Sequence, residues 1–320
     1  MSKKSNIICV LSYLFMVVLL FIVFRIFIKK NELDLLMKID LYTLVLFFIF
    51  ALIIYLINGL QYFFLKDQYG IKFEKKDFIL LPVAMNLWSF IIPMQGSAIF
   101  FSFFLKKKHN IKVADSLSIT IFLYLVTLFF AGFLGLVFTI IYEKIFSLFS
   151  LISLLLLLNP LFVFIAYKII LVIPDLKIKL IMHIFNFIKG IVVNMSKMWL
   201  DYKNVGAILL VSILQMVIIA FWYLSIAQAL GYHNITFLSL LLLALWMHVS
   251  LIIRFTPNNL GVTQIVSAIL FSLISLSPEQ GVMISLIASA VTMVIAFTLG
   301  VGANIYYLKR WHIKSLKEIS

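Results

Sequence analysis

The side chains best able to do chemistry in this sequence lie between Trp246 and Gln264, inside a long apolar region. Proline removes a backbone donor and glycine widens the allowed backbone angles, so this stretch predicts a break within a membrane helix. Broken backbone in lipid is tolerated only where protein or a wet cavity surrounds it, and an arginine at that depth is costly. The stretch is therefore a candidate binding site, with a short turn at the membrane surface as the alternative. Its candidate residues are Trp246, His248, Arg254, Pro257, Asn258, Asn259, Gly261 and Gln264.

A second stretch of the same kind occurs earlier, from Asn86 to Leu105. An apolar approach again meets a proline, a polar residue and a glycine before an apolar exit. The interval from the start of an earlier apolar segment is also similar, with 52 positions from Leu41 to Pro93 and 51 from Gly206 to Pro257. Paired, interrupted apolar segments in two halves of a chain are typical of transporter binding sites. The candidate residues here are Asn86, Pro93, Gln95, Gly96 and Ser97, and we expect Gln95 to lie near Gln264.

Patterns typical of catalysis are missing from the sequence. The five histidines lie apart, without the spacing of a metal site, and there is neither a glycine-rich phosphate loop nor a nucleophile elbow. We therefore expect no metal, no cofactor and no enzymatic activity. A membrane transferase acting on sugars or phosphates would need exposed carboxylates near its first external loop, where only Glu32, Asp34 and Asp40 stand. That kind of enzyme is the alternative function.

The composition indicates which elements must position these residues. Of the 320 residues, 64% are hydrophobic and 12% are charged, which is typical of a multi-pass membrane protein. The net charge of +14 comes mostly from lysines in short loops. That pattern marks cytoplasmic loops, so we expect no nucleic-acid partner. The single cysteine, Cys9, lies in the first apolar segment, where packing is its simplest role.

Six apolar runs are long enough to cross a membrane, and two further apolar segments are broken. The six spans cover about 7–28, 41–65, 115–142, 146–172, 206–230 and 279–307, with a kink expected at Pro160. Basic loops flank the broken segment 78–105 on both sides, which predicts a re-entrant hairpin, and 235–276 is its counterpart. In residues 174–204, polar positions recur at steps of three or four, which predicts an amphipathic helix in the cytoplasmic interface.

The distribution of Lys and Arg predicts the topology, because basic loops stay in the cytoplasm. Most of the 26 Lys and Arg fall in segments that this scheme makes cytoplasmic, including both termini. The first hairpin then enters from the inside and the second from the outside. The fold class is thus an all-α membrane domain over residues 1–320, with inverted repeats at about 7–142 and 146–307. Inverted repeats of this kind are common in transporters.

Two motifs resemble one family of flippase-like membrane proteins, whose domain is shared with the transmembrane region of lysylphosphatidylglycerol synthases. PMQGSAIFFSFFLKKKH, residues 93–109, is similar to the family's Pro-x-Arg-Gly-Gly and the Lys-rich loop after it. FTPNNLGVTQ, residues 255–264, is similar to its Thr-Pro-Gly-Asn-x-Gly-x-x-Glu. The resemblance covers essentially the whole chain. Residues 1–320 include no soluble aminoacyl-transferring domain, so we do not expect lysine transfer to lipid.

The motifs also depart from the family at four positions. Gln95 stands where the family often has Arg, and Gln264 stands where it has Glu. Ser97 and Asn258 replace glycines. Because the arginine and the glutamate are both missing, the resemblance does not imply a charge-coupled mechanism for this chain.

The expected function is binding an amphipathic lipid, or a lipid-linked saccharide, and moving it between leaflets during cell-envelope biogenesis. Helices that restart after Gly96 and near Gly261 would direct their N-termini at an anionic headgroup, and Arg254 would add a fixed cation. The partners would be membrane lipids and envelope-biosynthesis enzymes in a bacterial or archaeal cytoplasmic membrane. The sequence is also compatible with a small-solute transporter and with a non-transporting partner of an envelope enzyme complex.

Overall fold

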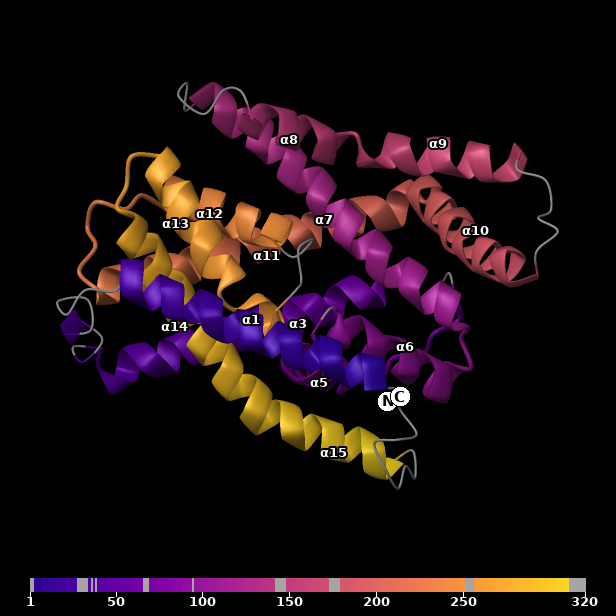
Figure 1. The fold of residues 1–320 in the computed structure, drawn as a ribbon, viewed down its shortest axis with the longest axis horizontal. Coiled ribbons are helices and arrows are strands. Elements are labelled where there is room, and N and C mark those ends of the chain that lie inside the picture. Colours follow the sequence, from indigo (N-terminus) through magenta and orange to yellow (C-terminus); the bar gives the residue numbers. More distant parts are fainter. Residues whose placement is uncertain are drawn as a thin grey trace. The chain divides into compact units, whose positions relative to one another are not determined.

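The computed structural model describes most of the chain, and the secondary structure of the described part is entirely helical. The described residues are 3–27, 34–35, 37, 39–65, 69–93, 95–141, 148–172, 179–250 and 256–310. The elements, traced in Figure 1 from indigo to yellow, are α1 (Lys3–Phe27), α3 (Leu41–Phe63), α5 (Asp77–Ile91), α6 (Gly96–His109), α7 (Val113–Ile141), α8 (Leu148–Leu157), α9 (Asn159–Val172), α10 (Lys179–Leu200), α11 (Tyr202–Ala229), α12 (Phe237–Ser250), η2 (Pro257–Asn259), α13 (Val262–Leu273), α14 (Pro278–Ile295), η3 (Ala296–Gly300) and α15 (Val301–Arg310).

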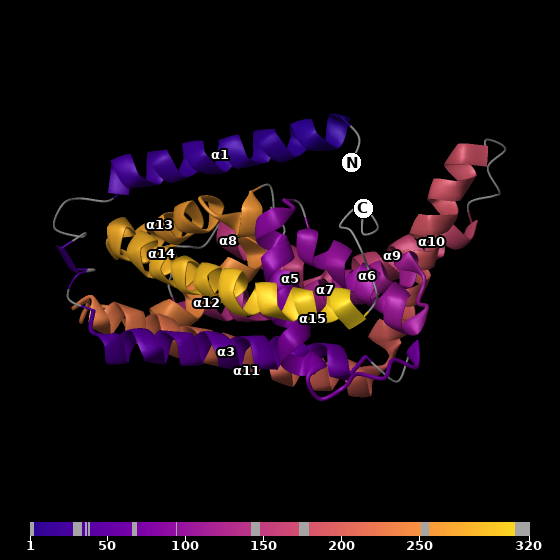
Figure 2. The ribbon, with the colours of Figure 1, turned by 90° about the horizontal axis from the view of Figure 1, so that it is seen from below.

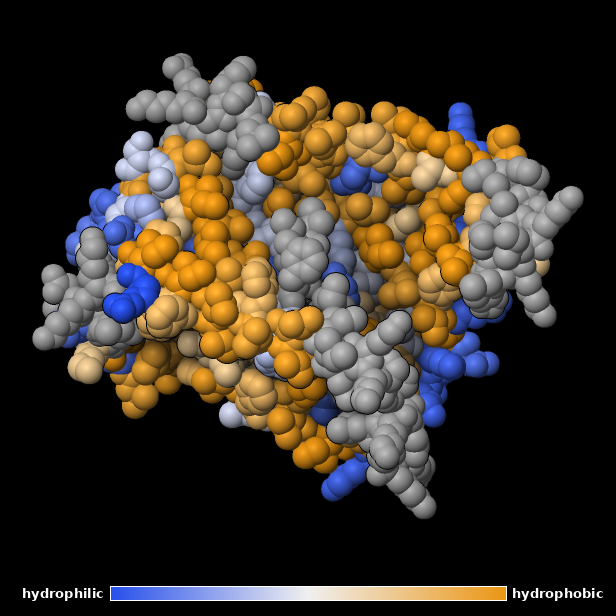
Figure 3. All heavy atoms as spheres, viewed as in Figure 1, coloured by the Kyte–Doolittle hydropathy of each residue, from blue (hydrophilic) through white to orange (hydrophobic). Residues whose placement is uncertain are grey.

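The helices confirm the predicted all-α membrane fold. Within the described residues, five helices are long and apolar enough to cross a membrane, or six if the bent pair α8 and α9 forms one span. Apolar side chains dominate the face seen in Figure 3, and many large ones on α1 and α3 are exposed, such as Val10, Phe21 and Leu41. Exposed apolar surface on this scale would be unfavourable in water and suits contact with lipid.

Both broken segments consist of a helix, a break and a second helix. The first has α5 and α6 on either side of residues 92–95, and the second has α12 and α13 on either side of residues 251–261. Neither α5 nor α12 is long enough to be a full span. The breaks therefore lie where the proline and glycine residues predicted them, while the side from which each hairpin enters stays a prediction.

The chain divides into two compact units. Unit one comprises residues 1–59, 74–97 and 214–320, and unit two comprises residues 60–73 and 98–213. Unit one thus draws on both predicted repeats, 7–142 and 146–307. The inverted relation of those repeats, and their place in a single domain, stay predictions.

In unit one, α14 lies at the centre, with α1 and α3 on opposite sides of it in Figure 2. Buried Val23 of α1 packs against Ala268 of α13 and Val282 of α14. On the other side, α3 approaches α5 so closely that a Cβ on Gly59 would overlap the Phe78 carbonyl oxygen. The last span continues from α14 through a π-helical turn, η3, into α15, and α5 packs against that turn through Gly300.

In unit two, α8 packs tightly on α7. A Cβ on Gly132 of α7 would lie 2.5 Å from the Ser153 carbonyl oxygen, so glycine is what permits this approach. The pair α8 and α9 bends by 50° between Leu157 and Asn159, just before Pro160. The predicted kink is confirmed, because proline is tolerated at the start of a helix but cannot extend the helix that precedes it.

The amphipathic segment predicted at 174–204 forms α10 over Lys179–Leu200. Its inner face includes buried Met195 and Met198, while Lys197 is exposed. The Asn194 side-chain amide donates a hydrogen bond of 2.6 Å to Asp115 Oδ1 at the start of α7. The position of α10 at the cytoplasmic interface stays a prediction.

Candidate functional site

The first break is a tight turn between α5 and α6. Gln95 has a φ of +84°, a left-handed backbone that side chains rarely adopt. Gly96 starts α6 against the backbone of α5, because a Cβ there would overlap the Trp88 carbonyl oxygen. Pro93 and Ser97 are buried, and Gln95 Oε1 is buried without a hydrogen-bond partner among the described residues. The turn is thus strained and polar inside an apolar surrounding.

Two side chains of α5 hold this helix against the last span. Asn86 donates one hydrogen bond to the Tyr55 hydroxyl of α3 and another, of 3.2 Å, to the Thr292 carbonyl oxygen of α14. Trp88 Nε1 donates a hydrogen bond of 2.6 Å to Asn304 Oδ1 of α15. Polar contacts between membrane helices stabilise their packing by roughly 0.5–2 kcal/mol each. Asn86 therefore joins three helices. Its hydrogen bond to Thr292 connects it with a residue that lines the cavity described below.

The second break depends on left-handed backbone at three positions close together. Asn258, Asn259 and Gly261 have φ values of +44°, +61° and +85°. Asparagine and glycine adopt this region more readily than other residues. The Asn259 amide donates 2.8 Å to the Ser250 carbonyl oxygen, an acceptor at the C-terminal end of α12. This hydrogen bond joins η2, which begins at Pro257, to the end of α12.

Gln264 organises the start of α13. Its Oε1 accepts hydrogen bonds from the Gly261 backbone N–H at 2.7 Å and from the Thr263 hydroxyl at 3.0 Å. A glutamine at this position of the first turn commonly caps the helix in this way. Its Nε2 donates 3.1 Å to the Ser289 hydroxyl of α14. The fully buried Gln264 thus bonds to α13 and α14, and no hydrogen bond joins it to Gln95 among the described residues.

These residues frame a cavity of about 170 Å³ between α11, α12, α13 and α14, called the polar cavity below. The break between α12 and α13 supplies Asn258, α13 supplies Thr263, α12 supplies His248, and α14 supplies a row of small polar side chains. The lining residues are Ile219, Trp222, Tyr223, Ala244, Met247, His248, Asn258, Thr263, Ser285, Ala288, Ser289 and Thr292.

Hydrogen-bonding groups line this cavity, and its described lining includes no Lys, Arg, Asp or Glu. His248 Nδ1 lies 2.8 Å from the Ala244 carbonyl oxygen, so this nitrogen carries a hydrogen and Nε2 is the acceptor in the neutral ring. Trp222 is only 4% exposed, and its Nε1 has no hydrogen-bond partner among the described residues. An unpaired buried donor costs about 1–3 kcal/mol.

The predicted site residues separate into groups. His248 and Asn258 line the polar cavity, and Asn259, Gly261 and Gln264 support its wall. Pro93, Gln95, Gly96 and Ser97 form the other break and do not line this cavity, and Trp246 is buried in α12. Arg254 lies outside the described residues.

The contributions of α11 and α14 to the cavity were not predicted from the sequence. Trp222 and Tyr223 occur in a span with no break, so nothing local distinguishes them from packing residues. Ser285, Ser289 and Thr292 carry a signal that could have been used. Their spacing of four and three residues puts small polar side chains on one face of an otherwise apolar helix.

A family model matches most of the chain. Residues 9–300 match the model of the lysylphosphatidylglycerol synthase transmembrane region. The chain belongs to this family. No curated protein and no solved structure matches the chain. The family membership and the apolar helices together make the chain a multi-pass membrane protein, related to proteins of lipid handling and envelope biogenesis.

Proposed function

We propose that this member of the lysylphosphatidylglycerol synthase transmembrane-region family binds a membrane lipid and moves it between leaflets, with the lipid headgroup in the polar cavity. The observation that carries the proposal is the cavity itself. Hydroxyl, amide and indole groups gather there within a bundle of apolar helices, and the Trp222 N–H has no partner among the described residues. Polar groups inside a membrane are costly and are therefore functional candidates.

The start of α13 favours an anionic group in the ligand, such as a phosphate. Thr263 lies in the first turn of this helix and lines the cavity, so an anion bound beside Thr263 would lie near the positive end of the helix dipole. Phospholipids and lipid-linked sugars both carry phosphate, and their tails can stay among the apolar helices. Arg254 as a further anchor for the anion stays a prediction. The cytoplasmic membrane of a bacterium or an archaeon is the proposed location.

Transport is tested in liposomes that contain the purified protein and a trace of fluorescent phospholipid. Dithionite bleaches only outer-leaflet fluorophores, so the rate of the slow phase reports movement of lipid between leaflets. We expect the protein to speed this movement and Trp222→Phe to slow it severalfold, because the variant keeps a six-membered aromatic ring and loses the indole N–H.

A matched control is Trp199→Phe in unit two. Trp199 Nε1 is also buried without a partner among the described residues, but its ring packs edge-on against Phe122 and Phe129 and lies outside the polar cavity. We expect this variant to transport lipid like the wild type. Equal rates for the wild type, both variants and empty liposomes would contradict the proposal.

The proposal includes the absence of catalysis, with a membrane sugar or phosphate transferase as the alternative. Mass spectrometry of the liposome lipids after incubation with candidate donors separates the two. A new lipid species formed only in the presence of the protein would favour the transferase.

A further inference from the structure

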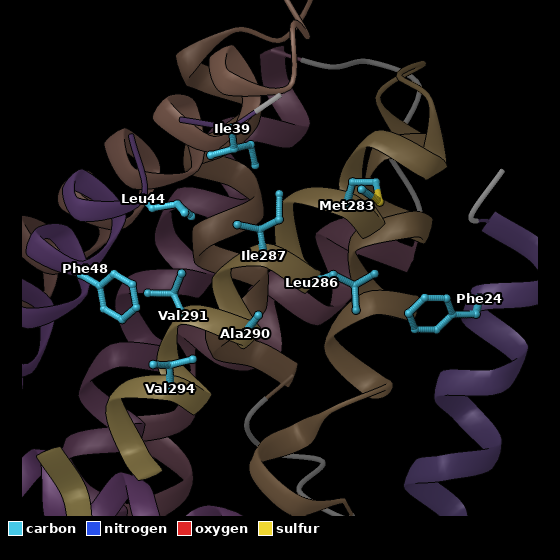
Figure 4. A pocket seen from close by; sticks show the side chains of 10 residues that line it. All are labelled: Phe24, Ile39, Leu44, Phe48, Met283, Leu286, Ile287, Ala290, Val291 and Val294. Carbon is cyan, nitrogen blue, oxygen red and sulfur yellow. The ribbon is translucent and has the colours of Figure 1, made fainter. Parts of the chain in front are cut away.

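Unit one contains a second space, which shares no lining residue with the polar cavity. This apolar groove has a volume of about 510 Å³ and lies between α1, α3 and α14. In Figure 4, Phe24 projects from α1 on one side and Leu44 and Phe48 from α3 on the other, with side chains of α14 between them. No polar side chain contributes to its described lining. We propose that this groove is a binding site for one acyl chain of a membrane lipid.

The length of the groove fits an acyl chain. Along α14 the lining runs from Met283 to Val294, roughly 16 Å at about 1.5 Å per residue. One leaflet of the hydrocarbon core is also roughly 15 Å thick, half of about 30 Å. A transmembrane helix from a second copy is about twice as long as this groove. At one end, Ile39 lies beside the exposed Asp40, which marks the membrane surface from which the chain would enter.

The walls of the groove are held by contacts outside it. On α1, Val23 is completely buried against α13 and α14, and the Tyr13 hydroxyl donates 2.6 Å to the Phe90 carbonyl oxygen of α5. On α3, Asn58 Oδ1 accepts 2.8 Å from Gln215 Nε2 of α11. These contacts fix α1 and α3 on opposite sides of the groove, so the space between them over α14 stays open.

The arrangement of α14 connects the groove with the polar cavity. Leu286, Ala290 and Val294 lie on the groove side, whereas Ser285 and Ser289 lie on the cavity side. At about 100° per residue, these two sets occupy different faces of the helix. One helix thus borders both an apolar space and a polar space. A lipid has matching parts, an apolar tail and a polar headgroup. The inference deepens the proposed function and rests on it for the identity of the ligand as a membrane lipid.

The test uses a phospholipid with a photoactivatable diazirine in mid-chain, added in trace amount to nanodiscs that contain the full protein. After irradiation, labelled residues are mapped by mass spectrometry. We expect labelling of the groove residues, Phe24, Phe48 and Leu286 among them, to exceed labelling of other exposed apolar positions. Ala290→Phe fills the floor of the groove, so a few methylene groups of the acyl chain can no longer be buried there. This loss should lower the labelling roughly tenfold.

The matched control is Ile269→Phe on α13, a position that is 54% exposed and outside the groove. It should leave groove labelling unchanged. Unlabelled fatty acid in excess should also reduce groove labelling of the wild type, which tests the site without any substitution. Uniform labelling of all exposed apolar positions, insensitive to the fatty acid, would overturn the inference.

Two lipids with the same chains and different headgroups, phosphatidylcholine and phosphatidylglycerol, separate this inference from the proposed function. An acyl-chain site should label equally with both. Groove labelling without transport in the liposome assay would reject the proposed function and leave the acyl-chain site standing. Transport without preferential groove labelling would reject the acyl-chain site and leave the proposed function standing.

Discussion

At the scale of single residues, buried amides distinguish the two breaks. Gln264 uses both ends of its amide, whereas Gln95 Oε1 has no partner among the described residues. Gln264 is thus a structural group, since it caps α13 and joins that helix to α14.

Replacing Gln264 by Ala should therefore lower the free energy of unfolding by about 1–3 kcal/mol, because buried hydrogen-bonding groups lose their partner. The Gly261 N–H and the Ser289 hydroxyl are the groups affected. Thermal unfolding in detergent measures the change, and Gln95→Ala serves as the control with a smaller expected effect. Equal losses of stability for the two variants would count against the capping role.

Gly261 combines two requirements that can be separated by experiment. Its φ of +85° disfavours any side chain, and a Cβ would also lie 2.6 Å from Leu19 Cβ of α1. Gly231 has a similar φ of +75° but open space around it. We expect Gly231→Ala to cost about 1–2 kcal/mol from the backbone alone and Gly261→Ala to cost more. Thermal unfolding of both variants measures the difference, and similar values would show that α1 does not press on Gly261.

At the scale of elements, the start of α3 shows how a loop carboxylate fixes a membrane helix. Asp40 Oδ1 accepts a hydrogen bond of 2.7 Å from the Thr43 backbone N–H, as an N-cap residue does. This hydrogen bond holds the pKa of Asp40 below its ordinary value. The cap should therefore stabilise the helix start above the ordinary pKa of aspartate, and the effect should be lost as the pH falls through the lowered pKa.

Amide hydrogen exchange at Thr43 and Leu44 tests this expectation, with each pH compared between the wild type and Asp40→Asn. Asparagine caps about as well as aspartate and carries no charge to titrate. We expect the wild type to lose protection relative to Asp40→Asn as the medium becomes acidic. A constant difference across that pH range would contradict the role of the carboxylate.

The same scale shows where prediction from sequence succeeds and where it stops. Apolar runs fix the spans, and Pro93, Pro257 and Pro160 mark the interruptions, because proline acts on its own local backbone. The π-helical turn at Ala296–Gly300 has no comparable local cause and was not predicted. The polar cavity likewise needs α11 and α14 beside the second break, a neighbourhood that no single segment encodes.

At the scale of the whole molecule, topology is the main prediction still to be tested. The basic loops predict that Lys72 and Lys107 lie on the same cytoplasmic side, with the first hairpin between them. With Cys9 replaced, single cysteines at these positions should resist an impermeant thiol reagent in intact cells and react after permeabilisation. Met37→Cys, in the predicted external loop and 89% exposed, is the positive control. Labelling of only one of the two lysine positions from outside would exclude the re-entrant hairpin.

The two faces of α14 have a thermodynamic consequence if both spaces bind parts of lipids. A shift or rotation of this one helix alters both spaces, so occupancy of one changes the affinity of the other by a reciprocal factor. Detergent is then not a neutral medium for this protein. A detergent tail that enters the apolar groove acts as an effector of the polar cavity. Headgroup affinities measured with and without that detergent in the groove should differ by the factor by which the headgroup alters detergent binding.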